Sequence, residues 1–158
     1  MQSGESSKIK VRLIALISSL AILPACAGER PLNLGVFDGK LRGCPSSPNC
    51  VSSFAPDEKH KIASFRYSAS KSEMRARLKS VLEKMEGTKI VIEKDNYLYA
   101  EFTSKLFRFV DDVEFLLDDE TKSIHFRSAS RLGRSDFGVN RKRIESIKSG
   151  LALKPGRV

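Results

Sequence analysis

Two neighbouring segments in which apolar and polar residues alternate constrain the fold of this chain most strongly. They are Val110–Leu117 and Ser123–Ser130, and the polar residues 118–122 connect them. Alternation with a period of two is typical of strands that bury one face. In an antiparallel pair, directly opposed residues point to the same side of the sheet, so the apolar positions fix the register. The predicted partners are Leu117 with Ile124, Phe115 with Phe126, Val113 with Ser128, Glu114 with Arg127, and Asp111 with Ser130.

The residues before and after this pair complete the outline of an α+β domain. A strand is expected over Ile62–Tyr67, and Ser70 followed three residues later by Glu73 is a capping box that opens a helix. Apolar residues at helical spacing extend this helix to Met85, and Gly87 is placed to end it. The remaining expected elements are the strands Lys89–Glu93 and Tyr97–Phe102 and a closing helix, Asn140–Ser149. The order of strand, helix, four strands and helix predicts an antiparallel β-sheet with two packed helices.

The segment Arg127–Arg143 combines six basic residues and one acid with small residues and two glycines. Guanidinium groups suit such a segment to pairing with carboxylates or with a bound anion. The segment ends in Arg141, Lys142 and Arg143, which fall in the first turns of the closing helix, where the helix dipole disfavours cations. This conflict predicts an acidic partner, either the aspartates that begin the first strand of the pair or a bound anion.

The predicted register places the acidic residues of one strand beside the beginning of this basic segment. We therefore expect the side chains of Arg127, Arg131 and Arg143 to converge near Asp111 and Asp112. The alternative is a set of cross-strand salt bridges that only stabilises the sheet. The candidate ligand-binding residues are Arg127, Ser128, Ser130, Arg131, Arg134, Asp136, Asn140, Arg141, Arg143, Asp111, Asp112 and Glu114.

The N-terminal residues have the layout of an export signal. Three basic residues precede Leu13–Leu23, an uncharged run that is too short to cross a bilayer stably. The ending Leu23-Pro24-Ala25-Cys26 resembles the lipobox of bacterial lipoproteins, in which cleavage precedes a cysteine whose sulfur is lipidated. The alternative is an ordinary cleaved signal in which Cys26 has no role. We expect residues 1–25 to be a lipoprotein signal peptide, 26–43 a flexible tether, 44–153 a single α+β domain and 154–158 a frayed tail.

Cys44 and Cys50 are the two cysteines that remain once Cys26 is lipidated. An even pair in an oxidising compartment is expected to form a disulfide, which would staple the loop ahead of the first strand. Metal binding is the alternative, but His60 and His125 lie far apart in the sequence and match no ligand spacing. We therefore predict no metal and no cofactor.

Four segments together resemble an uncharacterised family of bacterial and plastid proteins, the domain of unknown function 1499. The resemblance covers residues 34–151, and the matching segments are Leu34–Val36, Cys44–Ser53, Phe109–Phe115 and Arg127–Arg143. It implies that the chain shares the fold and the motifs of that family. It implies no reaction, because the family has no established activity.

The net charge of +9 falls to +7 once the predicted signal takes away three basic residues and one acid. An exported basic protein meets lipid headgroups, glycans and proteins, and no nucleic-acid recognition motif is present, so no nucleic acid is expected as a partner. We expect a lipid-anchored protein of the cell envelope that faces the periplasm from the inner or the outer membrane. Its basic segment is expected to bind an anionic small molecule or an envelope protein without catalysis.

Two alternatives remain for the basic segment. In the first, its arginines and the nearby acids satisfy one another and only stabilise the fold. In the second, the chain is an envelope hydrolase that uses a serine or an aspartate of Arg127–Arg143 or Asp111–Glu114. The sequence contains no nucleophile elbow, and Ser128 and His125 are predicted to point to opposite faces of their strand.

Overall fold

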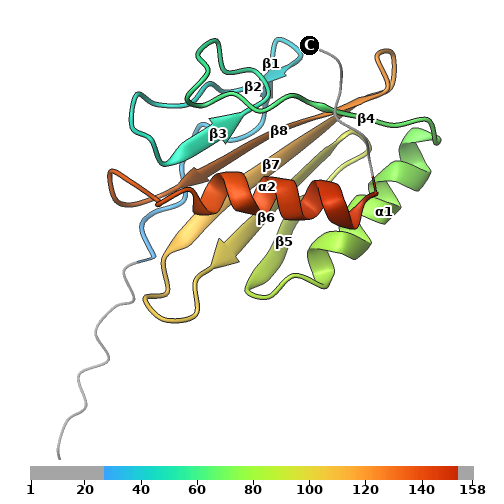
Figure 1. Cartoon of the computed structure of the whole chain (residues 1–158). Helices are drawn as coiled ribbons and strands as arrows, with labels where there is room; N and C mark the ends of the chain where they lie inside the picture. The colour runs from blue at the N-terminus through green and yellow to red at the C-terminus, as the bar shows by residue number, and fades with distance from the viewer. Residues whose placement is uncertain (1–26, 153–158) are drawn as a thin grey trace, which may run out of the picture.

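The structure, a computed structural model, describes residues 27–152 of the chain. A six-stranded antiparallel sheet forms its centre, with the strand order β3–β8–β7–β6–β5, and β4 pairs with β8 beside β3 (Figure 1). Both helices pack on the same face of this sheet. The elements are β1 (Val36–Phe37), β2 (Lys40–Leu41), β3 (Cys50–Ser52), β4 (Phe65–Arg66), α1 (Lys71–Glu83), β5 (Thr88–Glu93), β6 (Tyr97–Thr103), β7 (Val110–Asp118), β8 (Ser123–Ser130) and α2 (Val139–Gly150). The predicted α+β class is confirmed.

The register of β7 with β8 agrees with the prediction at every position. The structure pairs Leu117 with Ile124, Phe115 with Phe126, Val113 with Ser128, Glu114 with Arg127, and Asp111 with Ser130. The agreement follows from the period of two, because a slip by one residue would turn the whole apolar set away from the helices.

One face of the sheet, called here the helix face, carries the main hydrophobic core. Helix α1 begins after Ser70, whose Oγ accepts a hydrogen bond from the amide of Glu73 at 3.2 Å, as the capping motif predicts. Both helices then direct apolar side chains onto the strands. The fully buried core residues include Met74, Leu78 and Leu82 of α1, Ile144 and Ile147 of α2, and Val113, Phe115, Leu117, Ile124 and Phe126 of the sheet.

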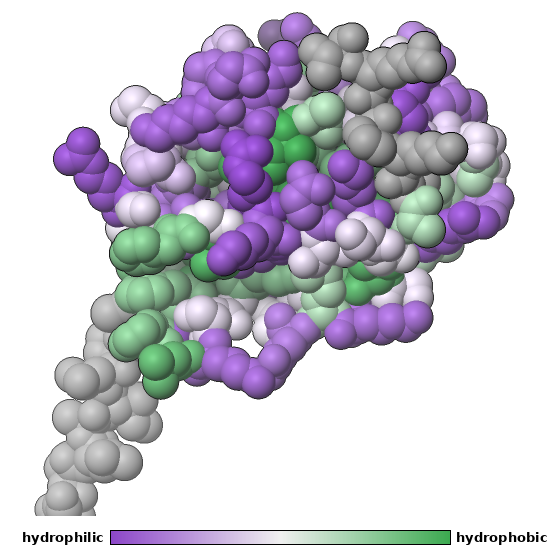
Figure 2. Space-filling view, viewed as in Figure 1, coloured by the Kyte–Doolittle hydropathy of each residue, from purple (hydrophilic) through white to green (hydrophobic). Residues whose placement is uncertain are grey.

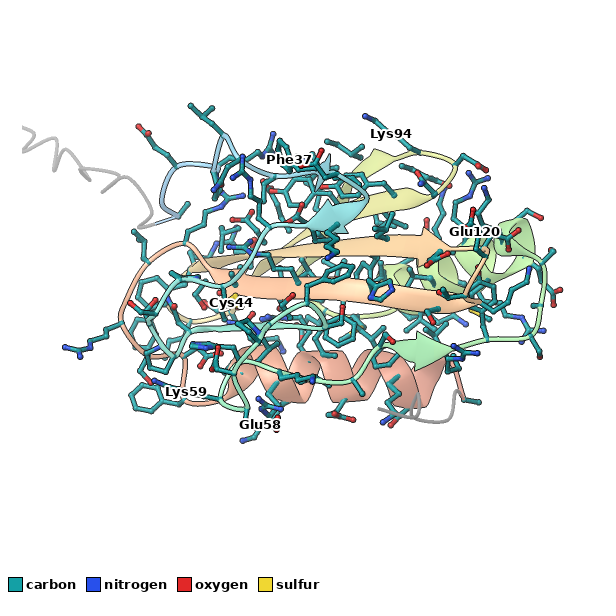
Figure 3. The ribbon with its side chains drawn as sticks, turned by 90° about the horizontal axis from the view of Figure 1, so that it is seen from above. Phe37, Cys44, Glu58, Lys59, Lys94 and Glu120 are labelled. Carbon is teal, nitrogen blue, oxygen red and sulfur yellow. A yellow bond between two sulfur atoms is a disulfide. The ribbon has the colours of Figure 1, made fainter. Side chains whose placement is uncertain are left out.

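The opposite face, called here the loop face, is covered by residues 27–43, which we call the N-terminal segment. Figure 3 shows α2 on one side of the sheet and the hairpin of β1 and β2, with Phe37, on the other. Leu41 of this hairpin is buried with Tyr97, Tyr99 and Leu116 in a second, smaller core. Several residues of the segment predicted to be a flexible tether therefore contact the sheet, although most of its residues are exposed.

Short strands are the main difference between the structure and the sequence prediction. The sequence predicts no strand before residue 62, whereas β1, β2 and β3 all precede it. The predicted strand Ile62–Tyr67 shortens to the two residues of β4. Strands of two or three residues are too short to display alternation, and β3 and β4 form because the outer edge of β8 offers unpaired backbone groups.

The predicted disulfide between Cys44 and Cys50 is present, with the two Cα atoms 5.6 Å apart. It closes a small loop whose last residue, Cys50, is also the first residue of β3. The bond therefore fastens the chain to the sheet at the point where β3 begins to pair with β8.

No helix within residues 27–152 combines the length and the apolar character that crossing a membrane requires. The predicted signal peptide, Cys26 and the tail 154–158 lie outside the described residues.

Candidate functional site

The candidate site is divided between the two faces of the sheet. Asp111 and Asp112 are consecutive residues of β7, so their side chains point to opposite faces. Asp111 belongs to a helix-face cluster with Ser128, Ser130, Asn140 and Arg143. A loop-face cluster comprises Tyr97, Tyr99, Glu101, Asp112, Glu114, Arg127 and Arg131.

Arg143 organises the helix-face cluster from the second turn of α2. Its Nη2 donates to Asp111 Oδ2 at 2.5 Å, and its Nη1 donates to Asn140 Oδ1 at 2.7 Å and to Ser128 Oγ at 3.2 Å. The guanidinium also lies over the ring of Phe102, 4.7 Å from its centroid. The side chains of Arg143 and Asp111 are only 10% and 12% exposed. This arrangement ties the start of α2 to β7 and β8.

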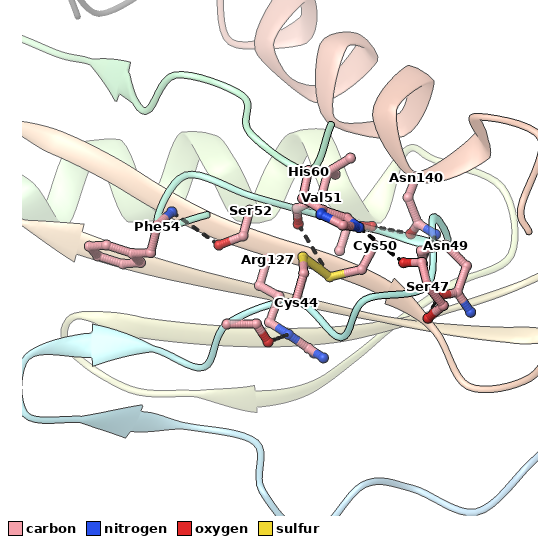
Figure 4. Close-up of a disulfide and its surroundings, with 12 residues drawn as sticks. Cys44, Ser47, Asn49, Cys50, Val51, Ser52, Phe54, His60, Arg127 and Asn140 are labelled. Carbon is pink, nitrogen blue, oxygen red and sulfur yellow. Dashed lines mark hydrogen bonds between the residues drawn. A yellow bond between two sulfur atoms is a disulfide. The ribbon is translucent and has the colours of Figure 1, made fainter. Parts of the chain in front are cut away.

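Asn140 completes the same cluster from a wholly buried position. Its Nδ2 lies 3.0 Å from the carbonyl oxygen of Asn49, 3.0 Å from Ser130 Oγ and 2.8 Å from Asp136 Oδ2. Figure 4 shows the side chain of Asn140 directed at the loop that the disulfide closes. The amide therefore joins α2, β8 and that loop.

The predicted conflict between the basic residues and the dipole of α2 is resolved inside the chain. Asp136 accepts hydrogen bonds from the amides of Gly138, at 3.0 Å, and Asn140, at 2.8 Å, so a carboxylate caps the helix N-terminus. Arg143 has its acidic partner in Asp111, as expected. Arg141 turns away and donates to the carbonyl oxygens of residues 59 and 61.

Arg131 organises the loop-face cluster. Its Nη2 lies 2.7 Å from Asp112 Oδ1, 2.5 Å from Glu101 Oε1 and 3.1 Å from Tyr99 Oη, and its Nε lies 3.0 Å from Asp112 Oδ2. Its Nη1 donates to the carbonyl of Gly28 in the N-terminal segment at 3.5 Å. The hydrogen bonds accepted by Asp112 are the main reason that the pKa of Arg131 lies above its ordinary value.

Glu101 is held ionised between two arginines. Arg30 Nη2 lies 2.6 Å from the same carboxylate oxygen that Arg131 contacts. Burial alone would raise the pKa of Glu101, but the hydrogen bonds from Arg131, Arg30 and Tyr99 outweigh it and lower the pKa to about 2. The carboxylate therefore joins β6 to both the N-terminal segment and the end of β8.

Glu114 is fully buried in the loop-face cluster. Its Oε1 accepts hydrogen bonds from the amide of Gly35 at 2.6 Å and from Tyr97 Oη at 2.8 Å. Arg127 Nη1 is 3.5 Å from the other oxygen, while Arg127 Nε donates to the carbonyl of Gly43 (Figure 4). Burial is the largest influence on this carboxyl and raises its pKa.

The three arginines predicted to converge therefore form separate pairs. Arg143 contacts Asp111 and Arg131 contacts Asp112, as expected, but Arg127 contacts Glu114. The sheet separates Arg143 from the other two arginines, so the expected single basic site is wrong. Arg134 also stands apart, because it is exposed in the loop between β8 and α2.

Sequence reasoning missed the contribution of β6 and of the disulfide loop. Tyr97, Tyr99 and Glu101 alternate with apolar residues along β6, and the structure pairs Glu101 with Asp112. The same reasoning that fixed the register of β7 and β8 would have found these residues if it had been extended to β6. Asn49, whose Nδ2 donates to the carbonyl of Gly133 at 2.7 Å, carries no comparable signal.

A groove of about 390 Å³ adjoins the helix-face cluster, between the first turns of α2 and the end of β6. Its apolar lining includes Met85, Phe102 and Val139. Its charged lining consists of Lys105, Lys142 and Arg143 together with Glu86 and Asp111. The groove therefore combines an apolar wall with one more positive than negative charge.

The serine hydroxyl and the histidine of the hydrolase alternative do not meet. Ser128 Oγ donates to Asn140 on the helix face. His125 lies on the loop face, where its ring stacks on Phe54 at 4.3 Å between centroids and its Nδ1 is 3.2 Å from Ser53 Oγ. Residues 27–152 contain no group of three or more side chains placed to hold a metal ion.

Replacing Arg131 with alanine should strongly destabilise the domain, because Asp112 and Glu101 would remain buried beside each other without their shared cation. We expect Arg131→Ala to lower the free energy of unfolding by about 3 kcal/mol or more, measured by urea denaturation. The matched control is Arg134→Ala in the following loop, which should change this free energy by less than about 0.5 kcal/mol. Equal effects of the two substitutions would contradict a structural role for Arg131.

The lowered pKa of Glu101 predicts a pH dependence of stability. The unfolded chain takes up the proton at about pH 4.3, whereas the folded protein takes it up only near pH 2. The stabilisation by Glu101 is therefore complete above the unfolded pKa and disappears as the pH falls through the folded one. The free energy of unfolding of wild type should exceed that of Glu101→Gln by on the order of 3 kcal/mol near neutral pH. This difference should shrink toward zero near pH 2 in acid denaturation curves, and a difference independent of pH would rule out the ionised pair.

A comparison with known protein families gives one match. The model of a family described as "Protein of unknown function (DUF1499)" matches residues 40–151, which include β2 to β8, both helices and both clusters. No curated protein matches the chain. The matched segment covers more than half of the sequence, so the chain belongs to the DUF1499 family of proteins of unknown function.

Proposed function

We propose that this chain is a lipid-anchored domain of the bacterial cell envelope that binds an anionic ligand without transforming it. The anchor is Cys26, and the domain faces the periplasm from the membrane that holds it. The disulfide between Cys44 and Cys50 supports this proposal, because such bonds persist in oxidising compartments. The basic run and the short apolar run before Cys26 support it independently.

The groove beside α2 is the observation that carries the binding proposal. An anion that entered it would meet Lys142 and Arg143 on one side and Lys105 on the other. The Arg143 guanidinium is already oriented by Asp111, Asn140 and Ser128, so binding would cost little additional ordering. The apolar wall would accept a nonpolar part of the same ligand. This assignment narrows the ligand site from the whole basic segment to its last two residues, Lys142 and Arg143.

The other candidate residues are better explained as structural groups. Arg127 and Arg131 are occupied by carboxylates and carbonyls of the chain, and Arg141 by backbone carbonyls. Asp136 caps α2, and Asn140 joins β8 to the disulfide loop. The hydrolase alternative needs a base beside a hydroxyl of the basic segment, and Ser128 contacts Asn140 instead. The hydroxyl beside His125 is that of Ser53, which lies outside that segment and also bonds the backbone of Phe126.

The groove predicts a response to anions that depends on Lys142. Adding inorganic phosphate or glycerol phosphate should raise the Tm of wild type, because a ligand at ten times its Kd stabilises by about 1.4 kcal/mol. Lys142→Ala should abolish this rise and leave the Tm without ligand unchanged. The control Lys89→Ala, on the exposed part of β5, should keep the full rise. A rise that survives Lys142→Ala would place the anion elsewhere, and no rise in wild type would favour the purely structural alternative.

The anchor predicts incorporation of fatty acid at Cys26. Each buried methylene contributes about 0.8 kcal/mol to membrane binding, so two or three acyl chains would make release negligible. Metabolic labelling with a fatty acid should mark wild type and leave Cys26→Ser unlabelled, and only wild type should stay with the membrane fraction after a salt wash. Equal labelling of the two proteins, or a soluble wild type, would refute lipidation at this residue.

A further inference from the structure

Exposed apolar side chains gather at one end of the domain. They come from the β6–β7 loop (residues 104–109) and from the β8–α2 connection (residues 131–139), and we call these two segments together the apolar end. Leu106, Phe107 and Phe137 are 79%, 65% and 91% exposed. Phe109, Leu132 and Val139 add further exposed surface at 45%, 44% and 47%. Figure 2 shows apolar surface collected at the lower left of the molecule, where Figure 1 places the β6–β7 loop.

The topology brings these two segments together. The strands β6 and β8 end where β7 begins, because neighbours in this sheet are antiparallel. The amide of Arg131 donates to the carbonyl of Val110 at 3.2 Å, which joins the two connections at their base. The helix α2 starts at the same end, and Val139 lines one groove with Ser104 and Lys105. Residues far apart in the sequence therefore share one surface.

Exposed cations surround the apolar side chains. Lys105, Arg108 and Arg134 are all exposed in these two segments. Two acids lie nearby: Glu86 pairs with Lys105 and offsets its charge, and Asp136 caps α2, which leaves Arg108 and Arg134 as the main source of positive charge. Basic and apolar side chains on one surface are the combination that binds an anionic lipid interface.

The start of the described chain lies at this same end. The carbonyl of Gly28 accepts from Arg131, and an added Cβ at Gly28 would lie 3.0 Å from the Leu132 side chain. Arg30 holds the next part of the segment to Glu101. One residue, Ala27, separates Cys26 from Gly28, and the two steps of extended chain from one Cα to the other span at most ~7 Å. A lipid on Cys26 would therefore bring the membrane surface within a few ångströms of the apolar end.

We propose that the apolar end rests on the bilayer, with Phe107, Leu106 and Phe137 in the interfacial region and Lys105, Arg108 and Arg134 on anionic headgroups. This inference rests on the proposed anchor at Cys26. The short distance from Cys26 to Gly28 favours lipid over a protein partner as the occupant, because a partner would have to enter between the domain and its own membrane. The domain then has a fixed orientation, with the β7–β8 turn pointing away from the membrane.

Tryptophan fluorescence tests this orientation, because the wild-type chain contains no tryptophan. The full-length protein would be produced with Phe107→Trp, Phe137→Trp or Glu120→Trp, isolated from membranes and reconstituted in vesicles of phosphatidylcholine and phosphatidylglycerol. Glu120 is exposed in the β7–β8 turn, and Figure 3 shows it at the end of the molecule opposite the start of the described chain. Lipids brominated along their acyl chains quench only a tryptophan that enters the bilayer.

We expect brominated lipids to reduce the emission of the Phe107→Trp and Phe137→Trp proteins by about twofold or more, with a blue shift, and to leave Glu120→Trp unchanged. Flotation of the same vesicles reports the anchor separately. Protein that floats with the vesicles while neither loop reporter is quenched would overturn the docked orientation and leave the anchor standing. A blue shift in the emission of the Phe107→Trp or Phe137→Trp protein without quenching would indicate that the apolar end contacts protein. That result would also overturn the proposal. Protein that does not float would overturn both the anchor and the docking.

Discussion

The guanidinium group of Arg131 is the contact on which both the loop face of the sheet and the path of the N-terminal segment depend. It lies between Asp112 of β7 and Glu101 of β6, which are directly opposed residues of neighbouring strands. Two carboxylates in that position repel each other, and only the shared cation makes their pairing favourable. The same group reaches the carbonyl of Gly28. One side chain therefore joins the opposed carboxylates of two strands and holds the N-terminal segment beside them.

The two aspartates of β7 give the central strand a polar group on each face. Asp111 holds α2 through Arg143, and Asp112 holds the end of β8 through Arg131. Buried ion pairs recover little net stability after desolvation, and their best-attested role is to fix one arrangement among several. Most basic residues of the segment Arg127–Arg143 therefore have partners inside the protein. Of the basic residues in this segment, Arg134 and Lys142 remain exposed.

The parts of this structure that could be predicted are those in which one physical constraint dominates. The alternation in β7 and β8 determines their register, and the capping residues determine where α1 begins. The strands β1 to β3 escaped prediction, and β4 is shorter than predicted, because these strands form only where an open edge or a neighbouring strand pairs with them. The separation of Asp111 from Asp112 was implicit in the period of two, but the partner of each arginine depends on the path of the loop after Ser130. No local pattern encodes that path.

The pairing of two short strands with one edge of β8 has a consequence for copies of this protein that meet at high concentration. An open strand edge can recruit the edge of another molecule. Here β3 covers residues 127–129, β4 covers 123–124, and Ser53 donates its amide to Phe126 between them. On the opposite side of the sheet, β5 carries exposed charges and an irregularity between Ile90 and Ile92. Neither edge of the sheet therefore presents a long, flat strand, and this disfavours edge-to-edge pairing between neighbouring molecules.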